Sequence, residues 1–153
     1  MNENYEIDNL DREIITALIK DARTPFLELG RKLNVSAGTI HVRVEKLRKA
    51  GVITGSQLKI DAKKLGMDVC CFIGIILRSA NDYQKALEHL RDFSEVTEVH
   101  YTTGNYSLFI KVITKNIDSL YQFLSAKLQA IKEIQSTETF ISLQSPVQRE
   151  ITW

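Results

Sequence analysis

Six basic side chains lie close together in a chain that is otherwise almost neutral. The chain has 153 residues and a formal net charge of +1, yet residues 31–49 hold six Lys and Arg against one acid, Glu45. A local basic segment on a near-neutral protein indicates a localised anionic partner rather than general affinity for anions. The six bases are Arg31, Lys32, Arg43, Lys46, Arg48 and Lys49.

Helical spacing places part of this charge on one face. Ile40, Val44 and Leu47 recur at steps of four and three, so a helix from Ser36 to about Ala50 buries them together. Its first turn is small and uncharged, which lets backbone approach a DNA groove, and its later turns are basic, which suits phosphates. The opposite side carries Gly38, Val42, Glu45, Lys46 and Lys49, flanked by Thr39 and Arg43.

A sharp turn precedes this helix. Thr24-Pro25 predicts the cap and first residue of a short helix that stops at Asn34, a residue able to adopt a left-handed conformation. Ser36 then caps the basic helix. The pattern predicts a helix-turn-helix; the alternative is a helical hairpin with a solvated basic face. The candidate DNA contacts are Arg31, Ser36, Gly38, Thr39, His41, Val42, Arg43, Lys46 and Lys49.

The flanking elements complete a small N-terminal domain over residues 1–60. An earlier helix is expected from the helical spacing of Ile7, Leu10, Ile14 and Leu18. After a C-terminal cap at Gly51, residues 52–60 predict two short strands, which form a wing. A polar connector at 61–68 then leads into a second domain, 69–153.

In the second domain the hydrophobic pattern changes, and strands alternate with helices. Apolar and β-branched runs predict strands, and stripes at helical spacing predict helices. The order βαββαβ is the ferredoxin-like unit, so the fold class is α+β. The expected elements are strand 69–77, helix 82–93, strands 96–103 and 106–114, helix 117–131 and strand 134–143.

Several classes of function find no support in the residues. Cys70 and Cys71 are adjacent, so they cannot build a disulfide framework, and the three histidines lack metal-ligand spacing. No metal, cofactor or catalytic residue is expected. An enzyme built on the second domain ranks low, because no acid–base or nucleophile set is present. No apolar run is long enough to span a membrane, so we expect a cytoplasmic protein.

Several runs resemble the Lrp/AsnC family of bacterial regulators that respond to amino acids, and the resemblance covers nearly the whole chain. It is strongest to the asparagine-responsive branch. The runs include Ile7-Asp8-Asn9-Leu10-Asp11-Arg12, Leu33-Asn34-Val35-Ser36, Gly38-Thr39-Ile40-His41-Val42-Arg43-Val44-Glu45-Lys46, Cys71-Phe72-Ile73-Gly74-Ile75-Ile76-Leu77, Tyr101-Thr102-Thr103-Gly104 and Ile134-Gln135-Ser136-Thr137-Glu138-Thr139.

The resemblance implies a winged helix-turn-helix that binds duplex DNA, followed by an effector-binding domain. It also implies a homodimer through the second domain, assembled into an octamer, that regulates asparagine-metabolism genes and its own gene. The effector would be a free amino acid, L-asparagine, held between subunits. Many relatives have Gly-Asp-Tyr-Asp where this chain has Gly104-Asn105-Tyr106-Ser107. A leucine-type or architectural regulator, with a different effector or none, is the alternative.

An amino-acid effector needs acceptors for its ammonium and donors for its carboxylate. The second strand ends in hydroxyl side chains, and Asn105 adds an amide. The resemblance adds Phe123–Lys127 and Thr137–Thr139, with Lys127 on the carboxylate and Glu138 on the ammonium as a hypothesis. A plain hydrophilic strand end is the alternative. The candidate residues are Val99, His100, Tyr101, Thr102, Thr103, Gly104, Asn105, Phe123, Leu124, Ser125, Ala126, Lys127, Thr137, Glu138 and Thr139.

Overall fold

The computed structural model describes residues 5–149 and residue 151, and the chain divides into two compact units. The first contains the described residues up to Lys59 and those from Val147 on, and the second is Ile60–Pro146. The connector expected at 61–68 contains one short 3-10 helix, Lys63–Leu65. The second domain was expected to continue to residue 153, past the point where this unit ends.

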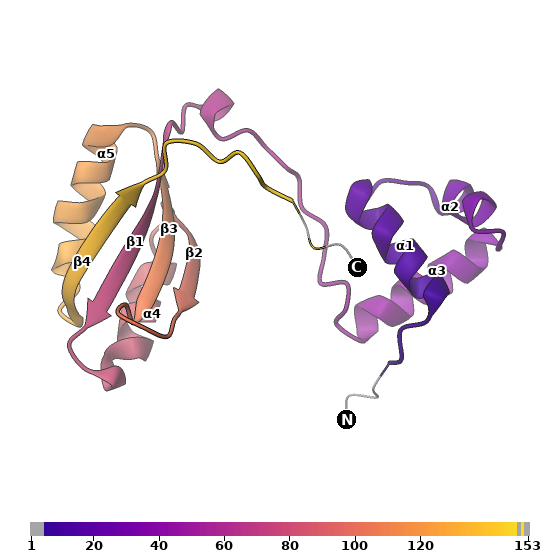
Figure 1. Ribbon diagram of the computed structural model, residues 1–153, viewed down its shortest axis with the longest axis horizontal. Coiled ribbons are helices and arrows are strands. Elements are labelled where there is room, and N and C mark those ends of the chain that lie inside the picture. The colour runs from indigo at the N-terminus through magenta and orange to yellow at the C-terminus, as the bar shows by residue number, and fades with distance from the viewer. Residues whose placement is uncertain (1–4, 150, 152–153) are drawn as a thin grey trace. The chain divides into compact units, whose positions relative to one another are not determined.

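Three helices form the first unit: α1 (Asn9–Lys20), α2 (Phe26–Lys32) and α3 (Ala37–Lys49) (Figure 1). Their apolar faces meet in a core of fully buried side chains, which joins all three helices. Burial of this shared stripe, rather than intrinsic propensity, holds such short helices together. The core residues are Ile14, Leu29, Ile40 and Val44.

Local signals set most of the helix ends. The Ser36 hydroxyl accepts a hydrogen bond from the Thr39 N–H at 3.0 Å, as expected of a cap. Asn34 is left-handed, with φ 55°, and Gly51 has φ 75° beyond the end of α3. The cap expected at Thr24 is wrong: its hydroxyl donates to the Asp21 carbonyl, and Pro25 precedes α2 without a side-chain cap.

The predicted wing is also wrong. Residues 52–60 are all described, and none of them lies in a strand. Ile53 packs on the core, but Leu58 and Ile60 are exposed, so this segment has no continuous buried apolar face that could hold a hairpin. An isolated two-stranded hairpin is marginal in water without such packing, which explains why the sequence pattern does not form one. The helix-turn-helix therefore stands without a wing.

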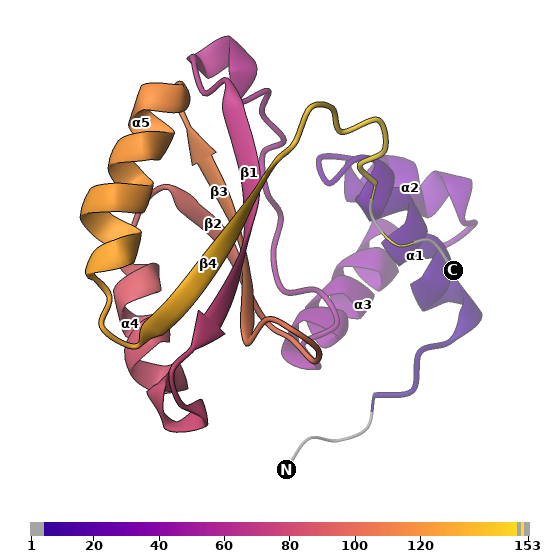
Figure 2. The same cartoon turned by 60° about the vertical axis from the view of Figure 1, so that its left-hand side comes forward.

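The second unit has the predicted βαββαβ order. Its strands are β1 (Val69–Leu77), β2 (Val96–Tyr101), β3 (Leu108–Thr114) and β4 (Ile134–Ile141), in an antiparallel sheet of order β2-β3-β1-β4. Helices α4 (Tyr83–Arg91) and α5 (Ile117–Gln122) cover the same face of the sheet (Figures 1 and 2). The other face carries no element of this unit.

The helix after β3 is less regular than the expected helix 117–131. α5 ends at Gln122, a π-helical turn follows at Phe123–Lys127, and a 3-10 turn ends at Ala130. Phe123 and Leu128 are buried under this segment and hold it on the sheet. The wider π turn changes the direction of the side chains that follow it, an effect that a 3.6-residue period cannot foresee.

Candidate nucleic-acid interface and effector site

One exposed stripe runs along α3. Gly38, Val42, Lys46 and Lys49 follow one another at steps of four, four and three, and all four are exposed. Ile40, Val44 and Leu47 are buried on the opposite side, as predicted. Val42 is 56% exposed although it is apolar. The stripe combines small and apolar groups at the start of the helix with two ammonium groups near its end.

A close backbone contact holds the turn that presents this stripe. The Val35 N–H donates to the Gly30 carbonyl at 2.9 Å. A Cβ atom on Gly30 would lie 2.7 Å from the Val35 carbonyl oxygen, so no side chain fits there. Sequence reasoning missed Gly30, because a glycine inside a short helix carries no signal of which backbone it meets. It is this glycine that allows α2 and α3 to approach so closely.

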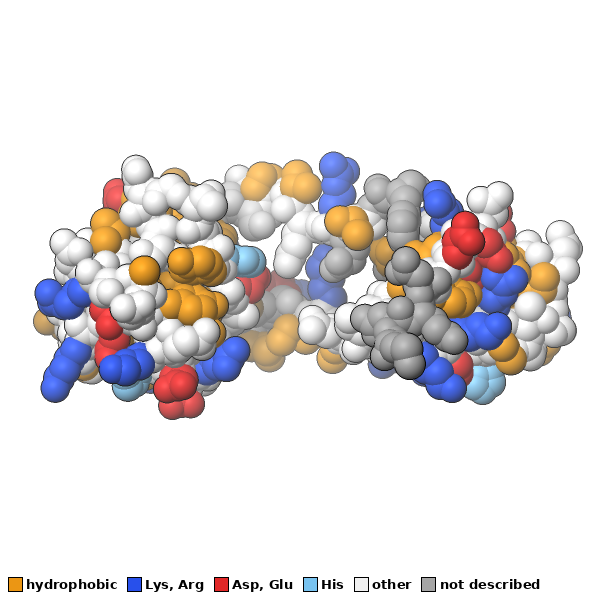
Figure 3. All heavy atoms as spheres, turned by 90° about the horizontal axis from the view of Figure 1, so that it is seen from below, with side chains coloured by type: hydrophobic (Ala, Val, Ile, Leu, Met, Phe, Trp, Pro, Cys, Tyr) orange, Lys and Arg blue, Asp and Glu red, His pale blue; other side chains and the backbone are white. Residues whose placement is uncertain are grey.

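The charged residues near the stripe differ in whether an acid already binds them. Lys46 and Lys49 have no ion partner within the described part of the chain. Arg48 donates to Glu45 at 2.8 Å, and Lys32 lies 3.6 Å from Glu28. On the face of the molecule drawn in Figure 3, basic and acidic side chains are interspersed, which agrees with the near-neutral net charge.

The remaining candidate DNA contacts are arranged around the stripe, with one exception. Arg31 is exposed at the end of α2, and exposed His41 lies beside Phe26, with ring centroids 6.0 Å apart. Ser36 and Thr39 form the first turn of α3. Arg43 is the exception, because its guanidinium donates to Asp8 and Asp11 at the start of α1.

In the second unit, the expected effector residues begin at the end of β2. Tyr101 is 64% exposed, and its ring centroid lies 4.6 Å from that of Tyr83. The Thr102 hydroxyl is already used, because it donates to the Tyr106 carbonyl at 2.8 Å. Exposed hydroxyl and amide groups therefore come from Tyr101, Thr103 and Asn105. Val99 packs on the core, the His100 Nε2 lies 3.4 Å from the Glu98 carboxylate, and Gly104 has φ 106°.

The helical part of the predicted site is largely engaged elsewhere. Phe123 is 1% exposed and packs edge-on against Phe93, so we leave it out of any ligand site. The Lys127 ammonium donates to Glu95 at 2.6 Å, and this bond is the main reason that the pKa of Glu95 lies below its usual value. Of the neighbours, Leu124 packs on the core, Ser125 donates to the Tyr121 carbonyl, and Ala126 is exposed.

The last strand lies across the sheet from the end of β2. Tyr101 pairs with Leu108, Leu108 with Ile75, and Ile75 with Thr137. Thr137 and Tyr101 are therefore three strand spacings apart, about 14 Å at about 4.8 Å each. Thr139 pairs with Ile73 in the same orientation as Thr137. One amino acid cannot touch both strands within one subunit.

Glu138 faces the side of the sheet without helices, where an aromatic patch gathers. Tyr106 donates to the Glu138 carboxylate, which raises the pKa of the tyrosine. Its ring lies over Gly74, where an added Cβ would come within 2.6 Å of a ring atom. The ring centroids of Phe72, Phe109 and Phe140 follow at spacings of 6.1 and 6.3 Å. We call Phe72, Tyr106, Phe109 and Phe140 the open-face patch.

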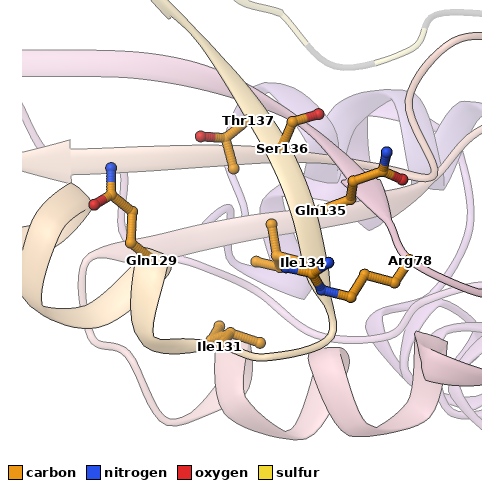
Figure 4. Close-up of a pocket in the computed structure, with 7 residues that line it drawn as sticks. All are labelled: Arg78, Gln129, Ile131, Ile134, Gln135, Ser136 and Thr137. Atoms are coloured by element: carbon orange, nitrogen blue, oxygen red, sulfur yellow. The ribbon is translucent and has the colours of Figure 1, made fainter.

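A shallow depression of about 320 Å³ lies beside β4, in a place that the sequence did not suggest (Figure 4). Among the predicted residues, only Thr137 lines it. Arg78 brings a guanidinium whose Nε donates to the Lys132 carbonyl at 2.9 Å, and no described acid pairs with it. Arg78 was missed because it belongs to β1's exit, far from β4 in sequence. The depression is lined by Arg78, Gln129, Ile131, Ile134, Gln135, Ser136 and Thr137.

Other chemistries find little in the described residues. Within them, no group of three His, Cys, Asp or Glu side chains could hold a metal ion. Cys71 is buried, and burial raises the pKa of its thiol to about 11, which disfavours a reactive thiolate. None of the described helices is long and apolar enough to cross a membrane.

Comparison with known proteins matches both units. The AsnC-type helix-turn-helix domain matches residues 7–48, and the Lrp/AsnC ligand binding domain matches residues 70–152. The chain is 58% identical to Regulatory protein AsnC of Escherichia coli K12 over 149 residues, covering 97% of this chain and 98% of that one. It is 56% identical to Regulatory protein AsnC of Haemophilus influenzae over 147 residues, covering 96% and 98%. The solved structure of E. coli AsnC superposes with a TM-score of 0.92 at 56% identity, covering 96% of this chain and 99% of that one.

Proposed function

The chain belongs to the Lrp/AsnC family of transcriptional regulators, with a DNA-binding helix-turn-helix and a ligand-binding domain, and on that premise we propose how it works. It binds duplex DNA through α3 and controls genes of asparagine metabolism, its own gene included. A free amino acid, L-asparagine, binds between subunits and changes the occupancy of the DNA. We place this activity in the cytoplasm, where the DNA of a bacterium lies.

The exposed stripe of α3 is the observation that carries the DNA-binding part. Backbone near Gly38 can approach the base pairs closely, and Val42 offers a methyl-rich surface that suits the methyl group of thymine. Lys46 and Lys49 have free ammonium groups for phosphates. Ser36, Thr39 and His41 lie beside the stripe on the side that faces the DNA groove. Arg31, at the end of α2, contacts the sugar-phosphate backbone of the DNA.

The distances across the sheet support an effector site shared between subunits. Because Tyr101 and Thr137 lie about 14 Å apart in one chain, a ligand that meets both needs the β2 end of one subunit and β4 of another. Because Lys127 is paired with Glu95, the carboxylate of the ligand lacks the partner that the sequence suggested. We assign this contact to Arg78, whose guanidinium keeps free donors beside Thr137. Gln129 and Gln135 supply amides for the ligand's own amide.

The choice of asparagine rests on the turn between β2 and β3 and on the relatives. Asn105 and Ser107 stand where many relatives carry acids, so the turn offers neutral donors and acceptors instead of charge. The 56–58% identity to proteins named Regulatory protein AsnC supports the same effector class. Glutamine and leucine are the competitors to exclude.

We propose that the open-face patch is the surface on which two subunits form a homodimer, which then assembles into an octamer. Phe140 is 42% exposed in a single chain, and its three aromatic neighbours extend the patch along the sheet. A second copy of the same face would bury these rings at both sides, as a two-fold interface requires. Glu138 then lies at the edge of this interface, bonded to Tyr106.

Two measurements on the full chain test this function. Neutralising about five phosphates predicts a slope near −4.5 when the logarithm of the DNA association constant is plotted against the logarithm of salt concentration. Calorimetric titration should show heat for L-asparagine that exceeds the heat for leucine or glutamine. DNA binding without salt dependence would contradict the role of α3, and absence of heat for any amino acid would contradict the effector.

A further inference from the structure

Arg43 differs from the other bases of α3, because its charge is already satisfied within the first unit. One nitrogen, Nη1, donates to the Asp8 carboxylate and, at 3.1 Å, to the Asp11 carboxylate. The Arg43 side chain is only 29% exposed, whereas Lys46 and Lys49 extend into solvent. Two carboxylates already balance the charge of this guanidinium, so a phosphate gains less from it than from the unpaired ammonium groups of Lys46 and Lys49.

Asp11 makes the pairing necessary. Its side chain is 0% exposed, and both oxygens of its carboxylate accept hydrogen bonds. One oxygen accepts from the Tyr5 hydroxyl at 2.9 Å and from the Asp8 N–H at 3.2 Å, and the other accepts from Arg43. A buried carboxylate is tolerated only when it is hydrogen-bonded and its charge is balanced. Arg43 supplies that positive charge from the neighbouring helix.

The bridge joins two defined points of the helix pair. Asp8 and Asp11 form the capping box that begins α1, and Arg43 lies near the middle of α3, directly after the exposed Val42. The apolar contacts between α1 and α3 are non-directional. Hydrogen bonds to two carboxylates at the start of α1 are directional, so they add a specific constraint on the rotation of α3 about its axis.

We propose that Arg43 is a positioning residue: it fixes the rotation of α3 against α1, so that the exposed stripe faces the groove, and it makes no phosphate contact. This inference rests on DNA binding by α3. It separates the bases of α3 into two roles, since Lys46 and Lys49 neutralise phosphates while Arg43 determines which side chains the helix presents to the base pairs.

The variant Asp8→Asn distinguishes the two roles by the sign of its effect. Asn caps a helix as well as Asp does, so α1 keeps its start while the ion pair to Arg43 is lost. If Arg43 positions α3, the variant binds preferred DNA less tightly. If Arg43 contacts phosphate, the variant binds more tightly, because a repelling carboxylate is gone and the guanidinium is released. Glu13→Gln, an exposed neutralisation on the same helix, corrects for the change in net charge.

The experiment uses the full chain and two labelled probes: duplexes that the wild type selects from a random-sequence pool, and unselected duplex. Fluorescence anisotropy over a salt series gives the preference ratio and the salt slope. We expect Asp8→Asn and Arg43→Gln to lower the ratio about ten-fold, the size of one lost base contact, with the slope on unselected duplex unchanged. Lys46→Gln should reduce the magnitude of the slope by about 0.9 for each α3 helix that meets the duplex and keep the ratio.

Arg43→Lys guards against loss of folding. A lysine ammonium ends one bond short of Nη1 but keeps a positive charge facing both carboxylates, so this variant should keep a higher preference ratio than Arg43→Gln. A slope reduced by Arg43→Gln as much as by Lys46→Gln, or tighter binding of selected duplex by Asp8→Asn, would overturn the positioning role. Failure of the wild type to bind either probe would instead overturn the proposed function, and this inference with it.

Discussion

Lys46 and Lys127 show how the partners of a charged residue decide its role. Both were expected to bind a ligand's anionic group. Lys46 has no ion partner among the described residues, whereas Lys127 bonds Glu95 at 2.6 Å and lies 5.6 Å from the centroid of the Phe93 ring. A ligand carboxylate at Lys127 would have to share the ammonium with Glu95 at the cost of repulsion between the two carboxylates, so its net gain would be small.

Asparagine affinity should therefore depend on Arg78 rather than on Lys127. Arg78→Gln removes a charge-assisted hydrogen bond to the carboxylate, which is worth about 1.5–3 kcal/mol, so the affinity should fall by at least about ten-fold. Lys127→Gln, the matched control, should leave it within a factor of about two. Calorimetric titration of both variants measures this difference. Equal losses in the two variants, or a loss confined to Lys127→Gln, would contradict this assignment and show that Lys127 contributes to binding the carboxylate of asparagine.

Acid should weaken the contact between α1 and α3. The hydrogen bond from Arg43 holds the pKa of the Asp8 carboxyl below its usual 3.8. Because the folded value is the lower one, this carboxylate stabilises the unit fully above its unfolded pKa, and the contribution is lost as pH falls through the folded pKa. Thermal melts between about pH 5 and about pH 2 should show a flatter acid limb for Asp8→Asn than for the wild type. Identical acid limbs would contradict the ion pair.

At the scale of elements, the sequence predicted best where a signal is local. The Ser36 cap, the left-handed Asn34 and the buried face of α3 each depend on a few neighbouring residues, and all three are confirmed. The wing failed because a hairpin needs an apolar face to pack on, and that depends on distant residues. The proposed effector site was foreseen only in pieces, since the end of β2 and β4 lie on opposite edges of one sheet and Arg78 directly follows the end of β1.

The turn between α2 and α3 should tolerate no side chain at Gly30. Gly30→Ala places Cβ 2.7 Å from the Val35 carbonyl oxygen, and the backbone shift should cost about 1–3 kcal/mol of unfolding free energy. Gly38→Ala meets nothing closer than the Ser36 hydroxyl at 3.6 Å, so it should stabilise α3 by up to about 1 kcal/mol. Urea denaturation of both variants gives the two free energies. A neutral Gly30→Ala would show that the helices need not approach so closely.

At the scale of the whole molecule, the side of the sheet without helices is the surface best suited to contact a second subunit. The helices bury one face of the sheet, and the open-face patch remains on the other. In the proposed dimer the patch becomes the centre of an interface. The same association would bring the β2 end of one subunit and β4 of another into one assembly, which the proposed effector site requires.

A charge in the open-face patch should therefore break the dimer. Phe140→Glu would bury a carboxylate in the interface without a partner, which costs several kcal/mol, so the dimer should dissociate at micromolar concentration. Tyr121→Glu, at an exposed aromatic residue on α5, is the matched control and should not yield monomers. Sedimentation velocity reports the species. A Phe140→Glu protein that sediments like the wild type would exclude this face as the dimer interface.

In the proposed function, an amino acid bound to the second unit controls the DNA affinity of the first. The most direct test measures the DNA dissociation constant of the full chain over a series of L-asparagine concentrations, and the asparagine dissociation constant with and without saturating DNA. Linkage requires the two affinities to change by the same factor, about 5- to 150-fold for typical coupling. A DNA affinity that stays constant up to saturating asparagine would contradict the account and identify a DNA binder without amino-acid control.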